Sequence, residues 1–193
     1  ILACQKGNFP VVISERNNPR KKNMPLKWKI AADLFYKRAD KIVLQTERVK
    51  KYYKQISGKK LEVIPNPVIN HGEFDYKRDK QVLAVGRLEH QKGFDLLIEA
   101  FCQAKIQKDW KLLIAGTGSE RKRLEKLIAK YNLQKKVELI GLQNSLEELY
   151  ANSSVFVLSS RFEGYPNALA EAMSFGLPCI SFDCEFGPAE LIE

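Results

Sequence analysis

Short apolar runs alternate with helical patterns along nearly all of this chain, and this alternation limits the folds that are open to it. The runs are apolar at nearly every position instead of at every second position, which is typical of strands that are buried on both faces. The segments between them have the length and polarity of surface helices. The alternation therefore predicts an α/β fold in which helices cover both faces of a doubly wound parallel sheet.

A polar stretch at 69–80 divides this pattern in two. Before it, we expect strands at 11–14, 41–46 and 61–66, and helices at 25–38 and 47–56. After it, we expect strands at 81–86, 111–116, 137–141, 154–160 and 177–182, and helices at 93–107, 119–133, 145–152, 166–175 and from 188. The pattern predicts the truncated end of one α/β lobe over 1–68, a linker over 69–80 and a Rossmann-like lobe over 81–193.

The positive charge is concentrated in the first third of the chain. The net charge is +9, and residues 1–66 carry 16 Lys or Arg against 5 Asp or Glu. Such a surface can face phosphates or an anionic membrane, and a solvated helical face is the alternative. Few aromatic residues accompany the basic ones at 16–51, and no RNP-like or helix-turn-helix pattern is present, so we expect no nucleic-acid partner.

The cysteine pattern argues against a disulfide framework and against a zinc site. The four cysteines are Cys4, Cys102, Cys179 and Cys184. No two form a CxxC pair, and the two histidines are far apart, so we expect small core residues in a reducing compartment and no metal. No apolar run reaches the length of a membrane-spanning helix, and no signal peptide is visible. The chain begins with Ile close to a strand, and we expect it to be a piece of a longer protein.

Two cations follow the first strand of the second lobe. This strand ends at Gly86, and Arg87 and Lys92 come next in VGRLEHQKGFD. Arg is a planar, two-pronged phosphate ligand and Lys a flexible point charge. Together they can clamp a diphosphate and neutralise charge on a leaving group; a surface loop with two solvated cations is the alternative.

A Gly-Thr-Gly turn follows the next strand. Gly116 and Gly118 permit close approach of a ligand to the backbone, and Ser119 is expected to cap the next helix. A tight turn with a capped helix and no ligand explains the motif equally well. The full dinucleotide fingerprint is absent, because Arg121 stands where its third glycine would be.

Two carboxylates separated by seven residues mark the run FEGYPNALAEAMSFGLP. Glu163 lies in the loop before a helix and Glu171 lies on the helix itself. Gly164 allows the loop to approach a sugar, and the first-turn amides form an anion site; these amides belong to Asn167, Ala168 and Leu169. An exposed carboxylate is the usual alternative. The small neighbours of Glu171 indicate close packing, so this acid needs a partner, and a sugar diol can supply it.

These residues together resemble a known family. The segments VGRLEHQKGFDLLIEAF, LIAGTG, FEGYPNALAEAMSFGLPCIS and GPAELI are similar to the nucleotide-sugar lobe of GT-B glycosyltransferases of family 4, the group 1 family. IPNPV resembles the start of that family's linker. The likeness is strong over 82–192 and weaker over 1–66, where the chain resembles the end of the acceptor lobe.

The resemblance implies retaining transfer of a sugar from a nucleotide diphosphate sugar, with no cofactor and no essential metal. Arg87, Lys92 and Glu163 would be catalytic, the first two on the diphosphate and Glu163 on the transferred sugar. Glu171 would bind the ribose, and the base would lie near Gly141 and Leu142. The implied donor-binding residues are Gly86, Gly116, Gly118, Gly141, Leu142, Gly164, Tyr165, Asn167, Ala168, Leu169 and Glu171.

The resemblance also suggests the role of the intact protein. We expect it to transfer a hexosyl or N-acetylhexosaminyl group, from a UDP-sugar in preference, to a glycan or lipid-linked acceptor of surface polysaccharide. We expect a cytoplasmic protein, with residues 16–54 approaching the inner face of an anionic membrane. The first lobe's glycine-rich loop and histidine have no match here, so this chain alone is expected to be inactive. A non-catalytic nucleotide-sugar-binding module, or an epimerase or phosphorylase of the same fold, is the alternative.

Overall fold

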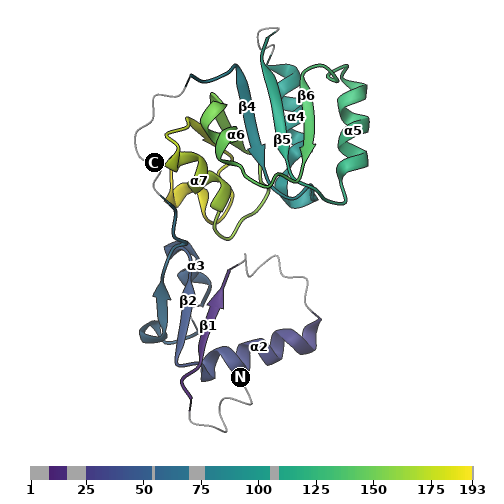
Figure 1. The fold of residues 1–193 in the computed structure, drawn as a ribbon. Helices are drawn as coiled ribbons and strands as arrows, with labels where there is room; N and C mark the ends of the chain where they lie inside the picture. Colours follow the sequence, from purple (N-terminus) through teal and green to yellow (C-terminus); the bar gives the residue numbers. More distant parts are fainter. Residues whose placement is uncertain (1–8, 17–24, 54, 70–76, 105–108, 193) are drawn as a thin grey trace. The chain divides into compact units, whose positions relative to one another are not determined.

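The chain folds into two compact units, which are described separately. The computed structural model describes residues 9–16, 25–53, 55–69, 77–104 and 109–192 (Figure 1). The first unit comprises residues 1–67, 163–165 and 185–193, and the second comprises 68–162 and 166–184. Most of the expected linker, and Cys4 and His71, lie outside the described residues.

The first unit is built on a three-stranded parallel sheet in the order β1-β2-β3. Its elements are β1 (Val12–Glu15), α2 (Leu26–Arg38), β2 (Lys41–Leu44), α3 (Glu47–Lys50), η2 (Lys51–Tyr53), η3 (Gly58–Lys60), β3 (Leu61–Val63) and η5 (Pro188–Glu190). The apolar side chains of β2 form the centre of its core, where Ile42 and Leu44 have no exposed surface. The expected α/β lobe end is therefore present, with β1 at one edge.

The first strand runs one residue further than expected, to Glu15. This carboxylate is only 5% exposed, and it accepts hydrogen bonds from the Tyr36 hydroxyl at 2.7 Å and the Tyr53 hydroxyl at 3.1 Å. A buried charge is tolerated where hydrogen bonds replace its hydration. The sequence pattern ended this strand at residue 14, before the polar Glu15, because the two hydroxyls that stabilise Glu15 come from elsewhere in the chain.

The helix expected at 47–56 is shorter than predicted. Its α-helical part ends at Lys50, and a 3₁₀ turn follows. The Glu190 carboxylate accepts the amide N–H groups of Glu47 and Arg48, at 2.8 and 2.9 Å. An anion at a helix N-terminus satisfies donors that the helix itself cannot use. Glu190 thus stabilises the start of α3, and its own segment forms a 3₁₀ turn and not an α-helix.

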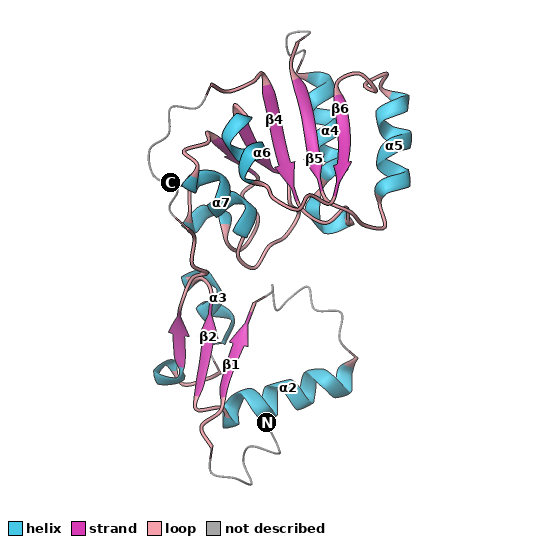
Figure 2. Cartoon of the chain, in the orientation of Figure 1, coloured by secondary structure: helices cyan, strands magenta, loops and turns pink. Residues whose placement is uncertain are grey.

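The second unit is a five-stranded sheet in which every strand pair is parallel. Its elements are β4 (Gln81–Val85), η4 (His90–Lys92), α4 (Phe94–Gln103), β5 (Lys111–Ala115), α5 (Arg121–Lys130), β6 (Val137–Gly141), α6 (Glu147–Asn152), β7 (Val155–Leu158), α7 (Asn167–Ser174) and β8 (Cys179–Ser181). The strand order is β6-β5-β4-β7-β8. The arrowheads of β4, β5 and β6 meet at one edge (Figure 2). The predicted doubly wound, Rossmann-like fold is confirmed.

Helices cover both faces of this sheet. In Figure 1, α6 lies on the viewer's side of β4 and α4 lies behind the sheet. The apolar stripes of α4 and α5 pack on the sheet through residues such as Ile98 and Leu124, which meet Leu112 and Ile114 in one core. Burial on both faces explains why these strands are apolar at consecutive positions.

The end of the expected linker packs against the second unit. The guanidinium of Arg78 donates hydrogen bonds to the carbonyl oxygens of Ser153, Phe175 and Gly176, at 3.3, 3.0 and 2.9 Å. The Asp79 amide donates to Asn152. These contacts secure the chain immediately before β4, so residues 78–80 are part of the packed lobe.

Candidate functional site

The strand order creates a crevice position at the carboxyl edge of the second unit. From β4 the chain continues to β5 on one side, and β7 pairs with β4 on the other side. Ligands of open α/β sheets bind at such a reversal of strand order, beyond the carboxyl ends of the strands. The loops after β4, β5, β6 and β7 all begin at this edge, since the strands are parallel.

The glycines of the first two loops bring backbone close to backbone. Gly116 has a φ of 140°, and a Cβ atom there would lie 1.9 Å from the Gly86 carbonyl oxygen. A Cβ at Gly118 would lie 2.4 Å from the Leu88 carbonyl oxygen, and the Gly116 amide donates to Gly141 at 2.8 Å. The protein's own backbone therefore requires both glycines to be small, as the tight-turn alternative expects, whether or not a ligand also approaches them.

Ser119 does not cap α5 as expected. Its hydroxyl and its amide both donate to the Glu89 carboxylate, at 2.8 and 3.1 Å, and α5 has no side-chain cap. The hydrogen bond from the Ser119 amide, followed by that from its hydroxyl, lowers the pKa of Glu89. Glu89 thus joins the loop after β4 to the turn after β5, a link that the sequence pattern did not reveal.

Lys92 and Arg87 extend from the same loop. The Lys92 side chain lies across Gly86, where a Cβ atom would be 3.1 Å from the Lys92 Cε. Arg87 is exposed. The Ser159 hydroxyl donates to the Lys92 carbonyl oxygen at 2.9 Å, and the Arg161 amide donates to Gln91 at 2.8 Å. The segment after β7 therefore supports the loop that carries both cations.

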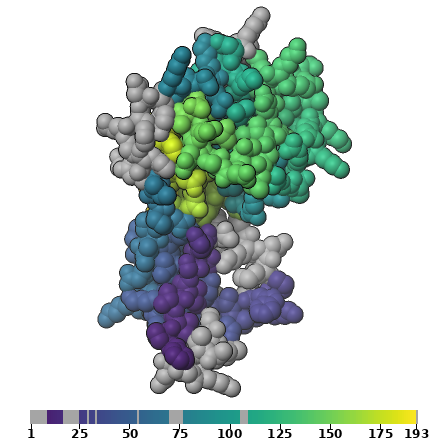
Figure 3. Space-filling model, in the orientation of Figure 1, coloured from purple at the N-terminus to yellow at the C-terminus, as the bar shows by residue number. Residues whose placement is uncertain are grey.

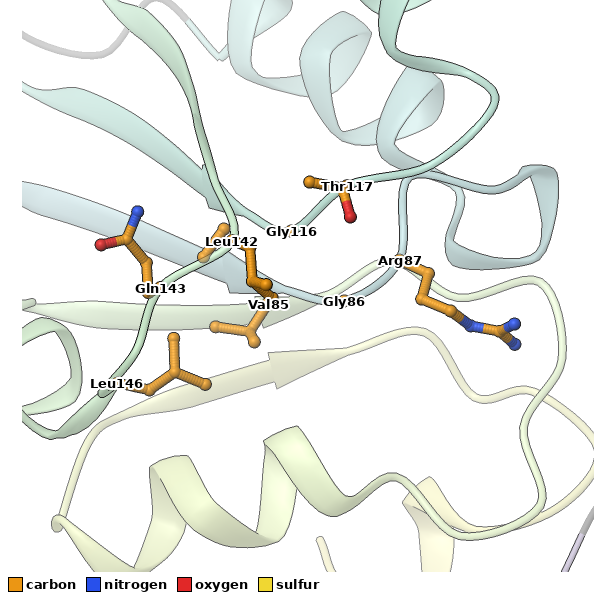
Figure 4. Close-up of a pocket in the computed structure, with 9 residues that line it drawn as sticks. Val85, Gly86, Arg87, Gly116, Thr117, Leu142, Gln143 and Leu146 are labelled. Atoms are coloured by element: carbon orange, nitrogen blue, oxygen red, sulfur yellow. The ribbon is translucent and has the colours of Figure 1, made fainter.

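A pocket of about 180 Å³ opens beside this loop. It is lined by Val85, Gly86, Arg87, Ala115, Gly116, Thr117, Leu142, Gln143 and Leu146. Figure 4 shows the Arg87 side chain extending away from Leu142, Gln143 and Leu146. The pocket thus brings together four of the expected residues, Gly86, Arg87, Gly116 and Leu142, with an apolar wall at one end and a guanidinium at the other.

The second glutamate of the predicted pair lies on α7 and has a partner within the protein. The Tyr150 hydroxyl donates to Glu171 Oε2 at 3.0 Å. In the first turn of α7, the Leu169 N–H group already donates a hydrogen bond to the Pro166 carbonyl oxygen at 3.0 Å. Asn167 is exposed and Ala168 half-buried, whereas the Leu169 side chain is fully buried in the core. The partner that the sequence pattern required for Glu171 thus includes a tyrosine that the pattern did not identify.

The first glutamate of the pair belongs to the first compact unit. Glu163, Gly164 and Tyr165 form a short stretch of that unit, in which Glu163 is 5% exposed. Burial, with the charge of Glu190, raises the pKa of Tyr165. The two glutamates are therefore assigned to different units, although only seven residues separate them in the chain.

Three further features concern metal ligands, cysteines and membrane-spanning helices. In the part of the chain that the structure describes, no three His, Cys, Asp or Glu side chains are placed to hold a metal ion. Among the described residues, Cys102, Cys179 and Cys184 form no disulfide, and burial raises the pKa of Cys179 to about 11. Within the same residues, no helix combines the length and apolar character that crossing a bilayer demands.

A family model confirms the resemblance. The model described as "Glycosyl transferases group 1" matches residues 69–193. The chain belongs to this family. The match covers all five strands of the second unit, the loop that carries Arg87 and Lys92, and helix α7 with Glu171.

Curated relatives include enzymes of polysaccharide and glycan assembly. The chain is 38% identical over 167 residues to the amylovoran biosynthesis glycosyltransferase AmsD of Erwinia amylovora, covering 82% of this chain and 47% of AmsD. It is 35% identical over 142 residues to a Campylobacter jejuni 4-alpha-N-acetylgalactosaminyltransferase that acts on a diphospho-undecaprenol-linked sugar, covering 70% of this chain and 38% of the relative. The chain thus spans about half the length of AmsD.

Solved structures agree on the fold. A variant of S. aureus TarM, in complex with fondaparinux, alpha-GlcNAc-glycerol and UDP, is 25% identical with a TM-score of 0.82, covering 95% of this chain and 39% of TarM. Anabaena HepE in complex with UDP superposes with a TM-score of 0.84 at 18% identity, covering all of this chain and 58% of HepE. These likenesses confirm a GT-B type architecture.

Proposed function

We propose that this chain binds a nucleotide diphosphate sugar, a UDP-sugar in preference, at the carboxyl edge of the five-stranded sheet. Arg87 and Lys92 hold the diphosphate, and the apolar pocket beside them takes the base near Leu142. Glu171 binds the ribose. The backbone of Gly86, Gly116, Gly118 and Gly141 shapes the crevice, and the first turn of α7 faces the sugar and phosphate.

The observation that carries this proposal is the placement of two cations on the loop after β4, next to an apolar pocket at the strand-order reversal. Lys92 lies across Gly86 and Arg87 lines the pocket. A diphosphate needs charge-assisted donors and a base needs an apolar slot. The similar TarM variant was solved in complex with UDP, which supports the choice of the same nucleotide here.

Calorimetric titration of the chain with UDP, UMP, uridine and GDP tests the proposal. We expect UDP to bind more tightly than UMP, and UMP more tightly than uridine. Arg87→Ala should weaken the binding of UDP about 10- to 150-fold, which corresponds to the loss of one charge-assisted contact. The same change should leave uridine binding unaltered.

Lys126→Ala is the charge-matched control, because Lys126 is an exposed cation on α5. This variant should bind UDP with an affinity within about a factor of two of that of the unaltered chain, since a single exposed charge contributes little to binding. Absence of UDP binding by the unaltered chain would contradict the proposal. Equal losses in the Arg87 and Lys126 variants would show a general charge effect instead of a diphosphate site.

In the longer protein, we propose transfer of a hexosyl or N-acetylhexosaminyl group with retention of configuration and without a metal. Glu163 contacts the transferred sugar, and Gly164 and Tyr165 contribute to its site. The acceptor is a glycan or a lipid-linked sugar of surface polysaccharide. This chain by itself should hydrolyse or transfer a UDP-sugar only at background rate, and turnover matching that of an intact relative would overturn this assignment.

The exposed face of α2 favours an approach to an anionic membrane from the cytoplasm. Leu26, Ile30 and Leu34 recur every fourth residue on one face of the helix and are 72%, 62% and 47% exposed, and the last turn of the helix carries Lys37 and Arg38. In Figure 3, α2 (indigo) forms part of the surface of the first unit. Apolar side chains beside cations are typical of helices that lie in the membrane interface.

Flotation with vesicles tests this surface. The chain should float with vesicles that contain about 30% phosphatidylserine, a strongly anionic composition, and remain below vesicles of phosphatidylcholine alone. Ile30→Ala with Leu34→Ala should abolish flotation. Equal binding to the two vesicle types, or flotation that the double variant retains, would rule out this membrane surface.

A further inference from the structure

The contact between Tyr150 and Glu171 joins two helices of the second unit. Tyr150 lies on α6 and Glu171 on α7, 21 residues apart in the chain. The hydroxyl donates to Glu171 Oε2 at 3.0 Å and also lies 3.4 Å from the Ala168 carbonyl oxygen. The tyrosine therefore contacts both the side chain of α7 that the proposed function uses and the first turn of that helix.

Packing fixes the tyrosine ring, so its hydroxyl has a defined position. Tyr150 is 2% exposed. Its ring stacks on Phe175, with centroids 5.4 Å apart and an interplanar angle of 26°, and lies tilted against Phe156 at 6.1 Å. Burial, followed by the neighbouring Glu171, raises the pKa of Tyr150. The phenol therefore remains a neutral O–H donor throughout the physiological pH range.

The hydrogen bond uses one of the two oxygens of the carboxylate. A carboxylate offers about four lone-pair sites on its two oxygens, and the Tyr150 hydroxyl occupies one site on Oε2. Glu171 is half-buried, and the remaining lone-pair sites of its carboxylate can accept hydrogen bonds from a ligand.

We infer that Tyr150 is a positioning residue for recognition of the ribose diol. It holds the Glu171 side chain in one rotamer, with Oε1 directed at the ribose hydroxyls of the nucleotide. A glutamate without this support has three rotatable bonds to restrict when the ligand binds, and that restriction reduces affinity. The inference rests on the proposed function, because it assigns a ligand contact to Glu171.

The test compares UDP with 2′,3′-dideoxy-UDP, whose affinity ratio reports the ribose hydroxyls alone. We expect the unaltered chain to prefer UDP. Tyr150→Phe keeps the packed ring and removes only the hydroxyl, so it should reduce the preference about three- to tenfold, which corresponds to the net contribution of a typical hydrogen bond. Its affinity for the dideoxy nucleotide should be unchanged.

Tyr131→Phe is the matched control. The Tyr131 hydroxyl also faces a glutamate of the same unit, with Glu99 Oε1 at 3.4 Å, but neither residue belongs to the proposed site. This variant should keep the full preference for UDP. Glu171→Gln should lose the preference by itself, and adding Tyr150→Phe to it should cause no further loss, because both changes act through one contact.

The outcomes separate the inference from the function on which it rests. If the unaltered chain fails to bind UDP, the proposed function fails and the inference with it. If UDP binds and Tyr150→Phe retains the preference, the inference alone is overturned. If Tyr150→Phe weakens the binding of both nucleotides equally, Tyr150 has a structural role only, and the inference is overturned. Should Tyr150→Phe fold poorly by circular dichroism, the ratio for Glu171→Gln decides, and a preference equal to that of the unaltered chain rejects the inference.

Discussion

The Arg161 guanidinium pairs with both oxygens of the Asp95 carboxylate, with Nη1 2.7 Å from Oδ1 and Nη2 2.8 Å from Oδ2. Arg161 Nη1 also donates to the His90 carbonyl oxygen at 2.9 Å. The pair therefore connects the segment after β7 with the first turn of α4 and with the loop that carries Lys92. Two parallel hydrogen bonds of this kind define an orientation as well as a charge contact.

Asp95→Asn should lower stability in a pH-dependent way. The hydrogen bond from Arg161 lowers the pKa of Asp95 against the opposing effect of burial, with a smaller contribution from Arg123. A carboxylate with a lowered pKa stabilises the fold above its unfolded-state pKa of about 3.9, and this contribution disappears as the pH falls below that value. We expect a cost of about 1 kcal/mol at pH 7, reduced by residual solvent screening.

Urea unfolding at pH 7, 4 and 3 measures this effect. The difference between the unaltered chain and Asp95→Asn should shrink as the pH falls. Asp109→Asn is the control, because Asp109 pairs with Lys80 where both side chains are more than half exposed, and it should change stability little. A difference that stays constant with pH would contradict the assignment.

Gly116→Ala should be more damaging than Gly141→Ala. Both glycines have positive φ values, 140° and 75°, but only Gly116 faces backbone, at 1.9 Å, whereas nothing lies within 4 Å of a Cβ at Gly141. The Gly141 change should cost about 1 kcal/mol for the left-handed conformation alone, and the Gly116 change should cost at least about 3 kcal/mol. Thermal unfolding compares them, and equal costs would show that the loop contact yields easily.

Ile114→Ala should destabilise the second unit, whereas Ile180→Ala should not. Ile114 on β5 has no exposed surface, and Ile180 on β8 is 59% exposed. Removing a fully buried side chain leaves a cavity and costs about 2–5 kcal/mol, whereas exposed changes stay within about 0.5 kcal/mol. Chemical denaturation of the two variants provides the measurement. If Ile114→Ala changes the free energy of unfolding by as little as Ile180→Ala, Ile114 is not part of the buried core.

Ser119→Ala should raise the pKa of Glu89 part of the way to its ordinary value. The variant removes the hydroxyl donor and keeps the amide donor, which is the larger cause of the lowered pKa. A carbon-13 NMR titration of the Glu89 carboxyl follows this shift, with Ser145→Ala as the control on a different loop. An unchanged midpoint would show that the hydroxyl contact is absent in solution.

The strands of the second unit were predictable because their signal is local. A strand buried on both faces needs several consecutive apolar residues, as in Leu112–Ile114, and the flanking glycines and polar turns bound it. The candidate loops were predictable for the same reason, since parallel strands place their carboxyl ends at one edge. Arg87 and Lys92 could therefore be assigned to a shared loop at that edge from the sequence alone.

Side-chain partners were not predictable, because no periodicity links residues on different elements. Ser119 looked like a helix cap, yet its hydroxyl meets Glu89, 30 residues earlier. The Gly-Thr-Gly turn fitted a ligand site and a plain tight turn equally well, and only the structure shows that the neighbouring loop requires small residues there. Local pattern identifies which residues can form hydrogen bonds or close contacts, but it does not identify their partners.

The sequence by itself determined the order of strands and helices, the edge at which the candidate residues gather and the family to which they point, because each depends on local patterns of apolar and turn residues. Only the tertiary structure decided that Tyr150 holds Glu171 and that Arg161 holds Asp95. Those pairs depend on how α6 packs beside α7 and how the loop after β7 meets α4. Such contacts arise when distant segments are buried together, and nothing in the spacing of the residues encodes them.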